Sequence, residues 1–321
     1  MRIFVTGSIA FDYIMVFPGK FQEHIVPEKM HVLSVSFLVD SLTRRRGGTG
    51  ANIAYNLALL GQNPVLVGTA GDDFGEYGAS LQEQGVDTSG VKVVSNEHTA
   101  SCFINTDLAD NQITAFYPGA MKQASTVSLL NPALRLTKED LVVIAPNDPG
   151  AMNRAVLECS ENGIPYLYDP AMQIPRLEKR DLELGCKGAK ILAGNDYEFG
   201  MMAEKMGIGE PELRKLVPVT VMTRGEAGAL VTAGGQEFEI PAAKPARVLD
   251  PTGAGDAFRA GFLLGVSKGL SWPVAGRLAS LSGVYAIEQH GTQQHAYSQA
   301  EFAARYRENF GSTEEIDFLA S

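Results

Sequence analysis

The 321-residue sequence has only three cysteines, Cys102, Cys159 and Cys186. An odd number without metal-ligand spacing argues against a disulfide framework and against a zinc site. Positive charge is also scarce, because 27 Lys and Arg face 37 Asp and Glu, which gives a formal net charge of −10. This balance argues against a general surface for nucleic acid or for an anionic membrane. It leaves room for a small anionic ligand, which backbone amides can bind.

Long apolar runs are missing as well. The first residues run into a strand-like stretch that reaches glycine at position 7, which is too short for a signal-peptide core. No later segment is apolar enough to span a membrane. We therefore expect a cytoplasmic protein without a nucleic-acid or membrane partner. The sequence shows no internal repeat and no low-complexity linker, so we expect one α/β domain over residues 1–321.

Strand-like and helix-like segments alternate along the chain. Strand-like apolar runs occur at Ile3–Ile9, Val65–Thr69, Leu141–Ala145, Tyr166–Tyr168, Ile191–Leu192 and Val219–Thr223. Helical spacing of apolar residues occurs at Asn52–Leu60, Phe74–Gln84, Ala151–Asn162 and Asp196–Met206. This alternation predicts a mostly parallel sheet flanked by helices on both faces. Towards the other end we expect a hairpin over 229–240, helices at about 254–268 and 272–288, and a surface helix after Tyr297.

Two regions, 11–46 and 91–120, break this alternation. They are rich in β-branched and aromatic residues with period-two stretches at Val32–Val39, Ala100–Asn105 and Ile113–Tyr117. We expect them to form a small β-sheet that covers a site at the strand ends as a lid. Because an uncovered sheet edge tends to be paired, we also expect a homodimer through this lid.

The chemistry is concentrated in the segment Asp250-Pro-Thr-Gly-Ala-Gly-Asp256, which a helix-like run follows. Glycines let the backbone approach a ligand, and the free N–H groups of a first helical turn suit phosphate or developing negative charge. An acid in that turn is better placed to take a proton from the group that attacks the anion. We therefore expect a phosphoryl-transfer site with Asp256 as base and the amides around Gly253, Ala254 and Gly255 as anion hole. A helix cap with an ordinary capping Asp is the alternative.

Two common phosphoryl-transfer signatures are absent. No Gly-Lys pair precedes Ser or Thr, as a Walker A motif requires, and the protein-kinase motifs are missing. The anion hole at 253–256 would therefore have to serve the reaction. The only basic cluster, Arg44–Arg46, is either a solvated loop face or the border of a phosphate or product path.

Four motifs, in the same order and over nearly the whole chain, resemble those of the ribokinase-like, or PfkB, carbohydrate and nucleoside kinases. They are Arg46-Gly-Gly-Thr-Gly-Ala-Asn52, Asn195-Asp-Tyr-Glu198, Thr223-Arg-Gly-Glu-Ala-Gly228 and Asp250-Pro-Thr-Gly-Ala-Gly-Asp-Ala-Phe258. Further stretches are similar to bacterial adenosine kinases of the mycobacterial type: Val5–Asp12, Ser36–Asp40, Phe116–Met121, Asn147–Pro149 and Arg259–Phe262.

The resemblance implies a ribokinase-like α/β fold and ATP-dependent phosphorylation of a nucleoside 5′-hydroxyl, with adenosine converted to AMP. Two alternatives stay open. One is a sugar kinase of the same family, acting on ribose or a related sugar, and the other is a nucleotide-binding sensor without turnover. The chain departs from the adenosine-kinase pattern at Cys102, where those relatives carry an aromatic residue. Which nucleobase the substrate carries therefore stays open.

By this resemblance, a first set of residues binds the nucleoside. Its members are Ser8, Asp12, Ser36, Gly47, Gly48, Asn52, Phe116 and Gln173. We expect Asp12 at the end of the first strand, where its two oxygens match the vicinal hydroxyls of a ribose. Phe116 would stack on the purine from the lid. The alternatives are a turn-capping role for Asp12 and a core position for Phe116.

A second set binds ATP and its metal ions. The implied nucleotide-binding residues are Asn195, Thr223, Gly225, Gly228, Gly253 and Gly255. Glu198 would bind Mg²⁺ through water, because Mg²⁺ keeps most of its waters. Asp250 and Thr252 match a site for a monovalent cation such as K⁺. The alternatives are an ordinary helix cap at Asn195 with Glu198 at its third position, and a loop-capping role for Asp250.

Overall fold

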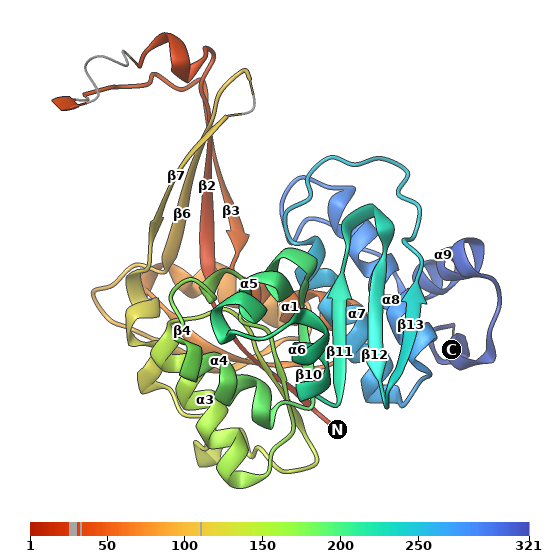
Figure 1. The fold of residues 1–321 in the computed structure, drawn as a ribbon. Helices are drawn as coiled ribbons and strands as arrows, with labels where there is room; N and C mark the ends of the chain where they lie inside the picture. Colours follow the sequence, from red (N-terminus) through yellow and green to blue (C-terminus); the bar gives the residue numbers. More distant parts are fainter. Residues whose placement is uncertain (26–30, 33, 110, 321) are drawn as a thin grey trace.

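In the computed structural model, which describes residues 1–25, 31, 32, 34–109 and 111–320, a nine-stranded sheet forms the centre of the molecule (Figure 1). Its strand order is β13-β12-β11-β10-β9-β8-β1-β4-β5. The bounds are β1 Ile3–Thr6, β4 Val65–Ala70, β5 Asp87–Val93, β8 Leu141–Ile144, β9 Tyr166–Tyr168, β10 Ile191–Asn195, β11 Val219–Thr223, β12 Ala229–Ala233 and β13 Gln236–Ile240. Neighbours from β11 to β5 are parallel, and β12 and β13 extend the sheet as an antiparallel hairpin.

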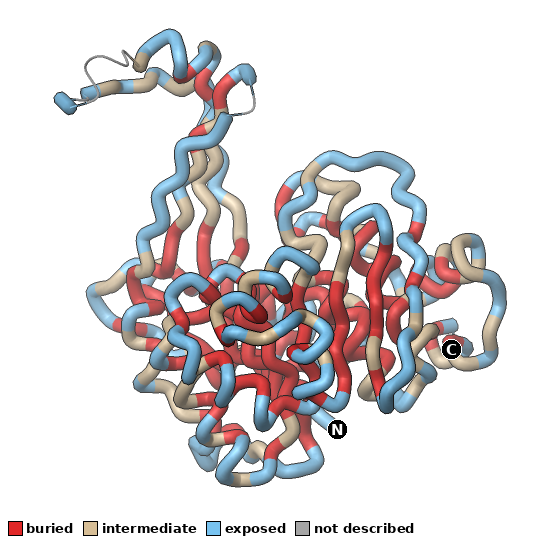
Figure 2. Tube along the Cα trace, in the orientation of Figure 1, coloured by how far each residue is buried: buried red, intermediate tan, exposed pale blue. Residues whose placement is uncertain are grey.

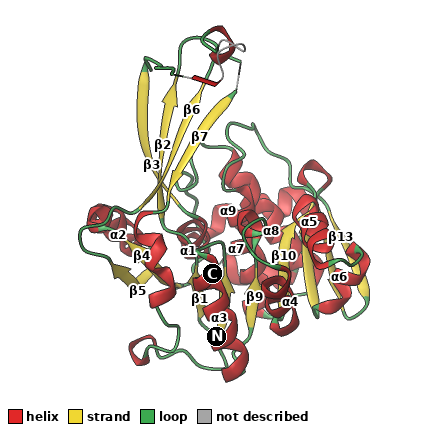
Figure 3. Cartoon of the chain, turned by 60° about the vertical axis from the view of Figure 1, so that its left-hand side comes forward, coloured by secondary structure: helices red, strands yellow, loops and turns green. Residues whose placement is uncertain are grey.

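Helices cover both faces of this sheet (Figure 3). On one face lie α1 Thr49–Leu59, α2 Gly75–Glu83, α7 Ala254–Lys268, α8 Trp272–Ile287 and α9 Gln299–Phe310, and on the other α3 Pro149–Asn162, α4 Lys179–Gly188, α5 Asp196–Met206 and α6 Glu210–Leu216. Strand β1 shows why both faces must be covered, because Ile3 and Val5 join one apolar cluster and Phe4 the other. Such strands read as continuous apolar runs. In the described part of the chain, no helix combines the length and apolarity needed to cross a membrane.

A separate four-stranded sheet, hereafter the small sheet, projects from the main body (Figures 1 and 3). Its order is β3-β2-β6-β7, with β2 Ala10–Val16, β3 Ser41–Gly47, β6 Ala100–Thr106 and β7 Gln112–Tyr117. Burial is high at its base, falls along the middle of the strands and rises again at the far end (Figure 2). At the far end the rings of Phe17, Phe21 and Phe37 pack at centroid distances of 4.8–5.6 Å.

The predicted elements are largely confirmed, and Tyr166–Tyr168, Val219–Thr223 and Asp196–Met206 have the expected bounds. The small sheet also forms, but two strand predictions were wrong. The first strand ends at Thr6 rather than Ile9, since the chain leaves the central sheet there. Within Val32–Val39, residues 34–39 form no strand, and Leu33 lies outside the described residues.

The misread stretch has a physical explanation. Its alternation arises because Phe37 packs into the aromatic cluster at the far end, and not because a sheet face is buried. In the second region, residues up to Val93 belong to β5 of the central sheet, and 119–126 form a 3₁₀ helix, η4. Helices α4 and α6 were not predicted.

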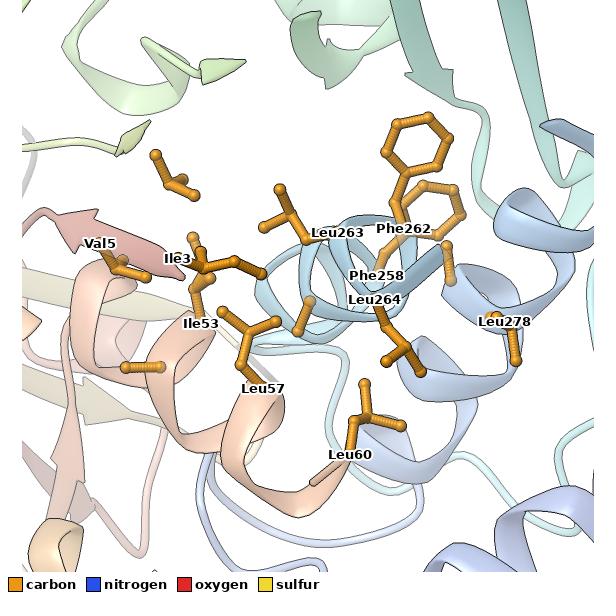
Figure 4. Packing of buried hydrophobic residues seen from close by; sticks show 14 of the residues in the cluster. Ile3, Val5, Ile53, Leu57, Leu60, Phe258, Phe262, Leu263, Leu264 and Leu278 are labelled. Atoms are coloured by element: carbon orange, nitrogen blue, oxygen red, sulfur yellow. The ribbon is translucent and has the colours of Figure 1, made fainter. Parts of the chain in front are cut away.

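Helix α7 packs against both α1 and α8 (Figure 4). Ile53 and Leu57 of α1 and Leu264 of α7 are fully buried in one apolar cluster. Complete burial of a side chain of this size contributes roughly 1.5–3 kcal/mol. Gly265 of α7 lies so close to Ala275 of α8 that a Cβ there would collide with it. This packing holds α1, α7 and α8 against one another.

Candidate active site

A cavity of about 830 Å³ lies where the carboxyl ends of the central strands meet the base of the small sheet. This is the edge at which parallel α/β sheets place their ligands, and the volume suits a small molecule. Most of the predicted site residues line it: Ser8, Asp12, Gly48, Asn52, Phe116, Gln173, Asn195, Glu198, Thr223, Gly225, Thr252, Gly253, Gly255 and Asp256. Asp12 and Asp256, from opposite ends of the sequence motifs, therefore face one space.

The remaining predicted residues lie outside the lining. Ser36 is exposed in the segment beyond the small sheet, and the structure does not bring it to the cavity. Gly47 lies behind the carboxylate of Asp12, with which a Cβ would collide. At Gly228 a Cβ would collide with the carbonyl of Ile240, so this glycine shapes the loop after β11. Asp250 and Ala254 stand just behind the wall formed by their neighbours.

Asp256 lies in the first turn of α7. The helix begins after Gly253, whose φ of 81° is in the left-handed region that favours glycine. The N–H groups of Gly255 and Asp256 have no intrahelical acceptor, because a helix leaves its first donors free. The N–H of Ala254 differs, since it lies 3.3 Å from the carbonyl of Pro251. An anion at this helix end would therefore meet Gly255 and Asp256 amides more readily than that of Ala254.

The carboxylate of Asp256 is held by Asn52. Nδ2 of Asn52 donates to Oδ2 of Asp256 at 2.8 Å, which joins the first turns of α1 and α7. Burial raises the pKa of Asp256 to about 6, although the guanidinium of Arg259 and this hydrogen bond both oppose the rise. The carboxylates of Glu198 and Asp12 add to the rise. A carboxyl with such a pKa is ionised at neutral pH and still basic enough to accept a proton.

Two residues that the sequence analysis gave no role complete this charge cluster. Nη2 of Arg259 donates to Oδ1 of Asp169 at 2.8 Å, and both side chains are buried. The guanidinium also lies 3.9 Å from Oε2 of Glu198. A signal for Asp169 was available, because a polar residue directly follows the predicted strand Tyr166–Tyr168.

Asn195 and Glu198 form a capping box at the start of α5. Oδ1 of Asn195 accepts from the N–H of Glu198 at 2.8 Å, and Oε2 of Glu198 accepts from the N–H of Asn195 at 2.8 Å. The helix-cap alternative is thus confirmed for this pair. Both residues nevertheless line the cavity, beside Thr223 and Gly225 at the end of β11.

At the other end of the cavity, Asp12 projects from β2 of the small sheet. The expectation that Asp12 ends the first strand was wrong, because β1 and β2 are separate strands in separate sheets. Burial and the carboxylate of Asp250 raise the pKa of Asp12 to about 6. Phe116 on β7 is 50% exposed, so its ring is not part of the core. Gln173 is buried in the 3₁₀ helix η6 (Ala171–Gln173), where its Oε1 accepts from Arg176 at 3.1 Å.

Asp250 organises the loop before α7. Its carboxylate accepts from the N–H groups of Thr252 and Gly291, both at 2.9 Å, so the loop-capping alternative is confirmed. Partial burial raises the pKa of Asp250, but these hydrogen bonds outweigh it and lower the pKa below its usual value. Among the described residues, no cluster of three or more His, Cys, Asp or Glu is arranged to hold a metal ion.

The basic run belongs to β3 and not to a loop. Arg44 stacks on the ring of Phe11, Arg45 donates to the carbonyl of His290, and Arg46 donates to Ser80. Arg45 and Arg46 thus fasten the small sheet to the main body, and none of the three lines the cavity.

Known proteins share this architecture. The chain is 37% identical to a nucleoside kinase from Burkholderia thailandensis, solved in complex with inosine, with a TM-score of 0.86 and 97% and 99% of the two chains covered. It is 30% identical to a nucleoside kinase from Methanothermobacter thermautotrophicus over 96% of each chain. It is 29% identical to a ribokinase from Bacillus subtilis over 91% and 94% of the chains. The model of the pfkB family carbohydrate kinases matches residues 9–299, and the chain therefore belongs to this family.

Proposed function

We propose that this kinase transfers the γ-phosphoryl group of ATP to the 5′-hydroxyl of a nucleoside. The observation that carries the proposal is that one cavity holds Asp256 at a helix N-terminus and, across from it, Asp12 and Phe116. The two carboxylate oxygens of Asp12 can accept from the two vicinal hydroxyls of a ribose, and the accessible ring of Phe116 can stack on a nucleobase. A sugar alone would leave the ring of Phe116 without a partner.

In this proposal Asp256 accepts the proton of the 5′-hydroxyl as that oxygen attacks phosphorus. General bases of this kind contribute typically about 10²–10⁴-fold. The free N–H groups of Gly255 and Asp256 lie beside the base, where they stabilise charge on the transferred phosphoryl oxygens. Proton removal and charge stabilisation are thus assigned to one helical turn.

ATP would lie along the cavity wall formed by Asn195, Thr223 and Gly225, which belong to neighbouring strand ends. In support, the Burkholderia nucleoside kinase has also been solved in an ADP-inosine complex. On this wall Glu198 would hold Mg²⁺, because its Oε2 is engaged in the capping box while Oε1 has no hydrogen-bond partner among the described residues. The carboxylate of Asp196 lines the cavity beside it. When bound there through water, the ion would neutralise phosphate charge. A monovalent cation such as K⁺ near Asp250 and Thr252 is part of the same proposal.

Adenosine is our first candidate substrate, and inosine is the second because the Burkholderia relative binds it. Ribose is the alternative from the same family, supported by the Bacillus ribokinase. We further propose that the chain forms a homodimer through the small sheet, whose Leu42 and Ile113 are exposed apolar side chains. Sedimentation velocity would test this, and a monomer at micromolar concentration would contradict it.

The experiment is a phosphorylation assay with ATP and Mg²⁺ over adenosine, inosine, guanosine, cytidine and ribose. Saturable turnover of a nucleoside, with little turnover of ribose, is the expected result. Asp256→Asn should lower kcat by about 10²–10⁴-fold and leave nucleoside binding largely intact. Asp87→Asn, in edge strand β5 outside the cavity, is the matched control. Undiminished turnover by Asp256→Asn would refute the assignment of the base.

A further inference from the structure

Asn52 is held from behind by two side chains of the segment that follows α8. Its Oδ1 lies 2.9 Å from Oγ1 of Thr292 and accepts from Nε2 of Gln293 at 2.8 Å. Gln293 is buried, and so is Asn52. An amide whose oxygen is engaged on one side must turn its nitrogen to the other, and that side is Asp256.

The direction of these hydrogen bonds is set at a backbone carbonyl. The hydroxyl of Tyr77 donates to the carbonyl of Gly47 at 2.8 Å, and a carbonyl can only accept. Burial raises the pKa of Tyr77 well above its usual range, so the hydroxyl keeps its proton. The oxygen of Tyr77 is then free to accept from Nε2 of Gln293, which lies 2.5 Å away.

The hydrogen bonds therefore run in one direction: Gln293 donates to Asn52, and Asn52 donates to Asp256. In the reverse sense, Gln293 would turn its oxygen towards Tyr77 and Asn52, and Asn52 would present its own oxygen to Asp256. That arrangement leaves the buried carbonyl of Gly47 without the Tyr77 proton. It also brings two oxygens together unless Asp256 is protonated, which would disable it as a base.

We propose that Gln293 is a positioning residue, which fixes the amide of Asn52 with its nitrogen towards Asp256 and so keeps the base in its proton-accepting form. The proposal rests on the proposed role of Asp256. Gln293 lies outside the cavity lining and acts only through Asn52. Tyr77 and Gly47 extend the same support to the end of β3, at the base of the small sheet.

Other charges also face Asp256 and set the background for a test by pH. Arg259 lies one turn further along α7, Glu198 comes from α5, Asp12 from β2 and Asp169 from the end of β9. None of these groups is altered when Gln293 is replaced by an uncharged side chain. A change in the pH profile would therefore report the loss of the hydrogen bond to the base.

The test compares Gln293→Met, which keeps the length of the side chain and removes its polar group, with Gln294→Met at the exposed neighbouring position. The readout is the pH profile of kcat at saturating nucleoside, where Asp12 is covered by substrate. In Gln293→Met the acid limb should move upward by about one pH unit, since a hydrogen bond to the carboxylate is lost. At pH values below the midpoint of the wild-type acid limb, Gln293→Met should have about one tenth of the wild-type activity. At a pH about two units above that midpoint, the two activities should be nearly equal.

A purely structural role predicts a different result, namely an activity loss of the same size at every pH. That result, or an acid limb shared by Gln293→Met, Gln294→Met and wild type, would overturn the proposal. Asp256→Asn separates the two levels of inference. If it is inactive while Gln293→Met keeps the wild-type profile, only the role of Gln293 is wrong. If Asp256→Asn is fully active, the proposed base is wrong.

Discussion

Arg259 and Asp169, 90 positions apart in the chain, form a buried ion pair one helical turn from Asp256. Burial raises the pKa of Asp169, and the guanidinium opposes that rise. Burial also raises the pKa of Asp256, and the same guanidinium opposes that rise. The pair thus joins the end of β9 to α7 and sets part of the electrostatic environment of the proposed base.

Removing one member of this pair should be far more costly than removing both. Asp169→Asn or Arg259→Met alone should lower the free energy of unfolding by about 3–5 kcal/mol, because a buried charge is left uncompensated. In the double variant the two losses should not add. Urea unfolding of the four proteins measures the coupling. Additive losses would show that the two charges are stabilised independently.

Gly47 should be essential for nucleoside binding although it does not touch the cavity. A Cβ there would collide with the carboxylate of Asp12, so Gly47→Ala displaces the group that we propose binds the ribose. Misplacement by about 1 Å can cost about 10²-fold, and we expect kcat/KM for the nucleoside to fall about 10- to 100-fold while KM for ATP changes little. Gly75→Ala in α2 is the control, because a Cβ there meets no atom within 4 Å. Equal losses for both substrates would point to general misfolding instead.

Asp107 should make the outer part of the small sheet sensitive to acid. Partial shielding raises its pKa, but hydrogen bonds from the N–H groups of Phe21, Ala109 and Asn111 and the side chain of Asn111 lower it to about 2. A depressed pKa stabilises the folded form above the unfolded value of 3.8, and this contribution is lost as the pH falls through about 2.

Hydrogen exchange at the amide of Phe21 measures this effect. Its protection should decrease between about pH 4 and pH 2 in the wild type. In Asp107→Asn it should be low throughout this window and independent of pH. The amide of Val143, buried in β8, reports global unfolding and serves as internal control. Parallel loss of protection at both amides would mean that the whole protein unfolds and that Asp107 has no separate role.

The sequence was sufficient for the central sheet because its strands are buried on both faces. Continuous apolar runs such as Leu141–Ile144 admit few other interpretations. Period-two alternation was weaker, since packing of Phe37 in a local cluster imitates a strand. Helices α4 and α6 were missed because they are largely polar and present few apolar residues with helical spacing.

For the site, motifs identified the residues that lie on strand ends and helix N-termini, such as Asp256 and Asn195. They could not identify the contacts between distant segments. Gln293 and Arg259 act through partners more than 80 positions away, and nothing local in the sequence marks such pairs. The small sheet added a further difficulty, since Asp12 was placed on the correct edge of the cavity but on the wrong strand.

Phe116 should distinguish a nucleoside kinase from a sugar kinase. Its ring lines the cavity and is half exposed, so a base can stack on it. Stacking of a base on an aromatic side chain contributes about 1–3 kcal/mol, and Phe116→Ala should therefore raise KM for a purine nucleoside about 5- to 150-fold.

Phe103→Ala is the matched control, because Phe103 lies on the neighbouring strand, stacks on Tyr13 at 4.9 Å and does not line the cavity. Phe116→Ala should leave any residual turnover of ribose unchanged, since ribose has no base to stack. If nucleoside and ribose kinetics deteriorate together, or if Phe103→Ala has the same effect, the ring supports the small sheet and does not contact the substrate.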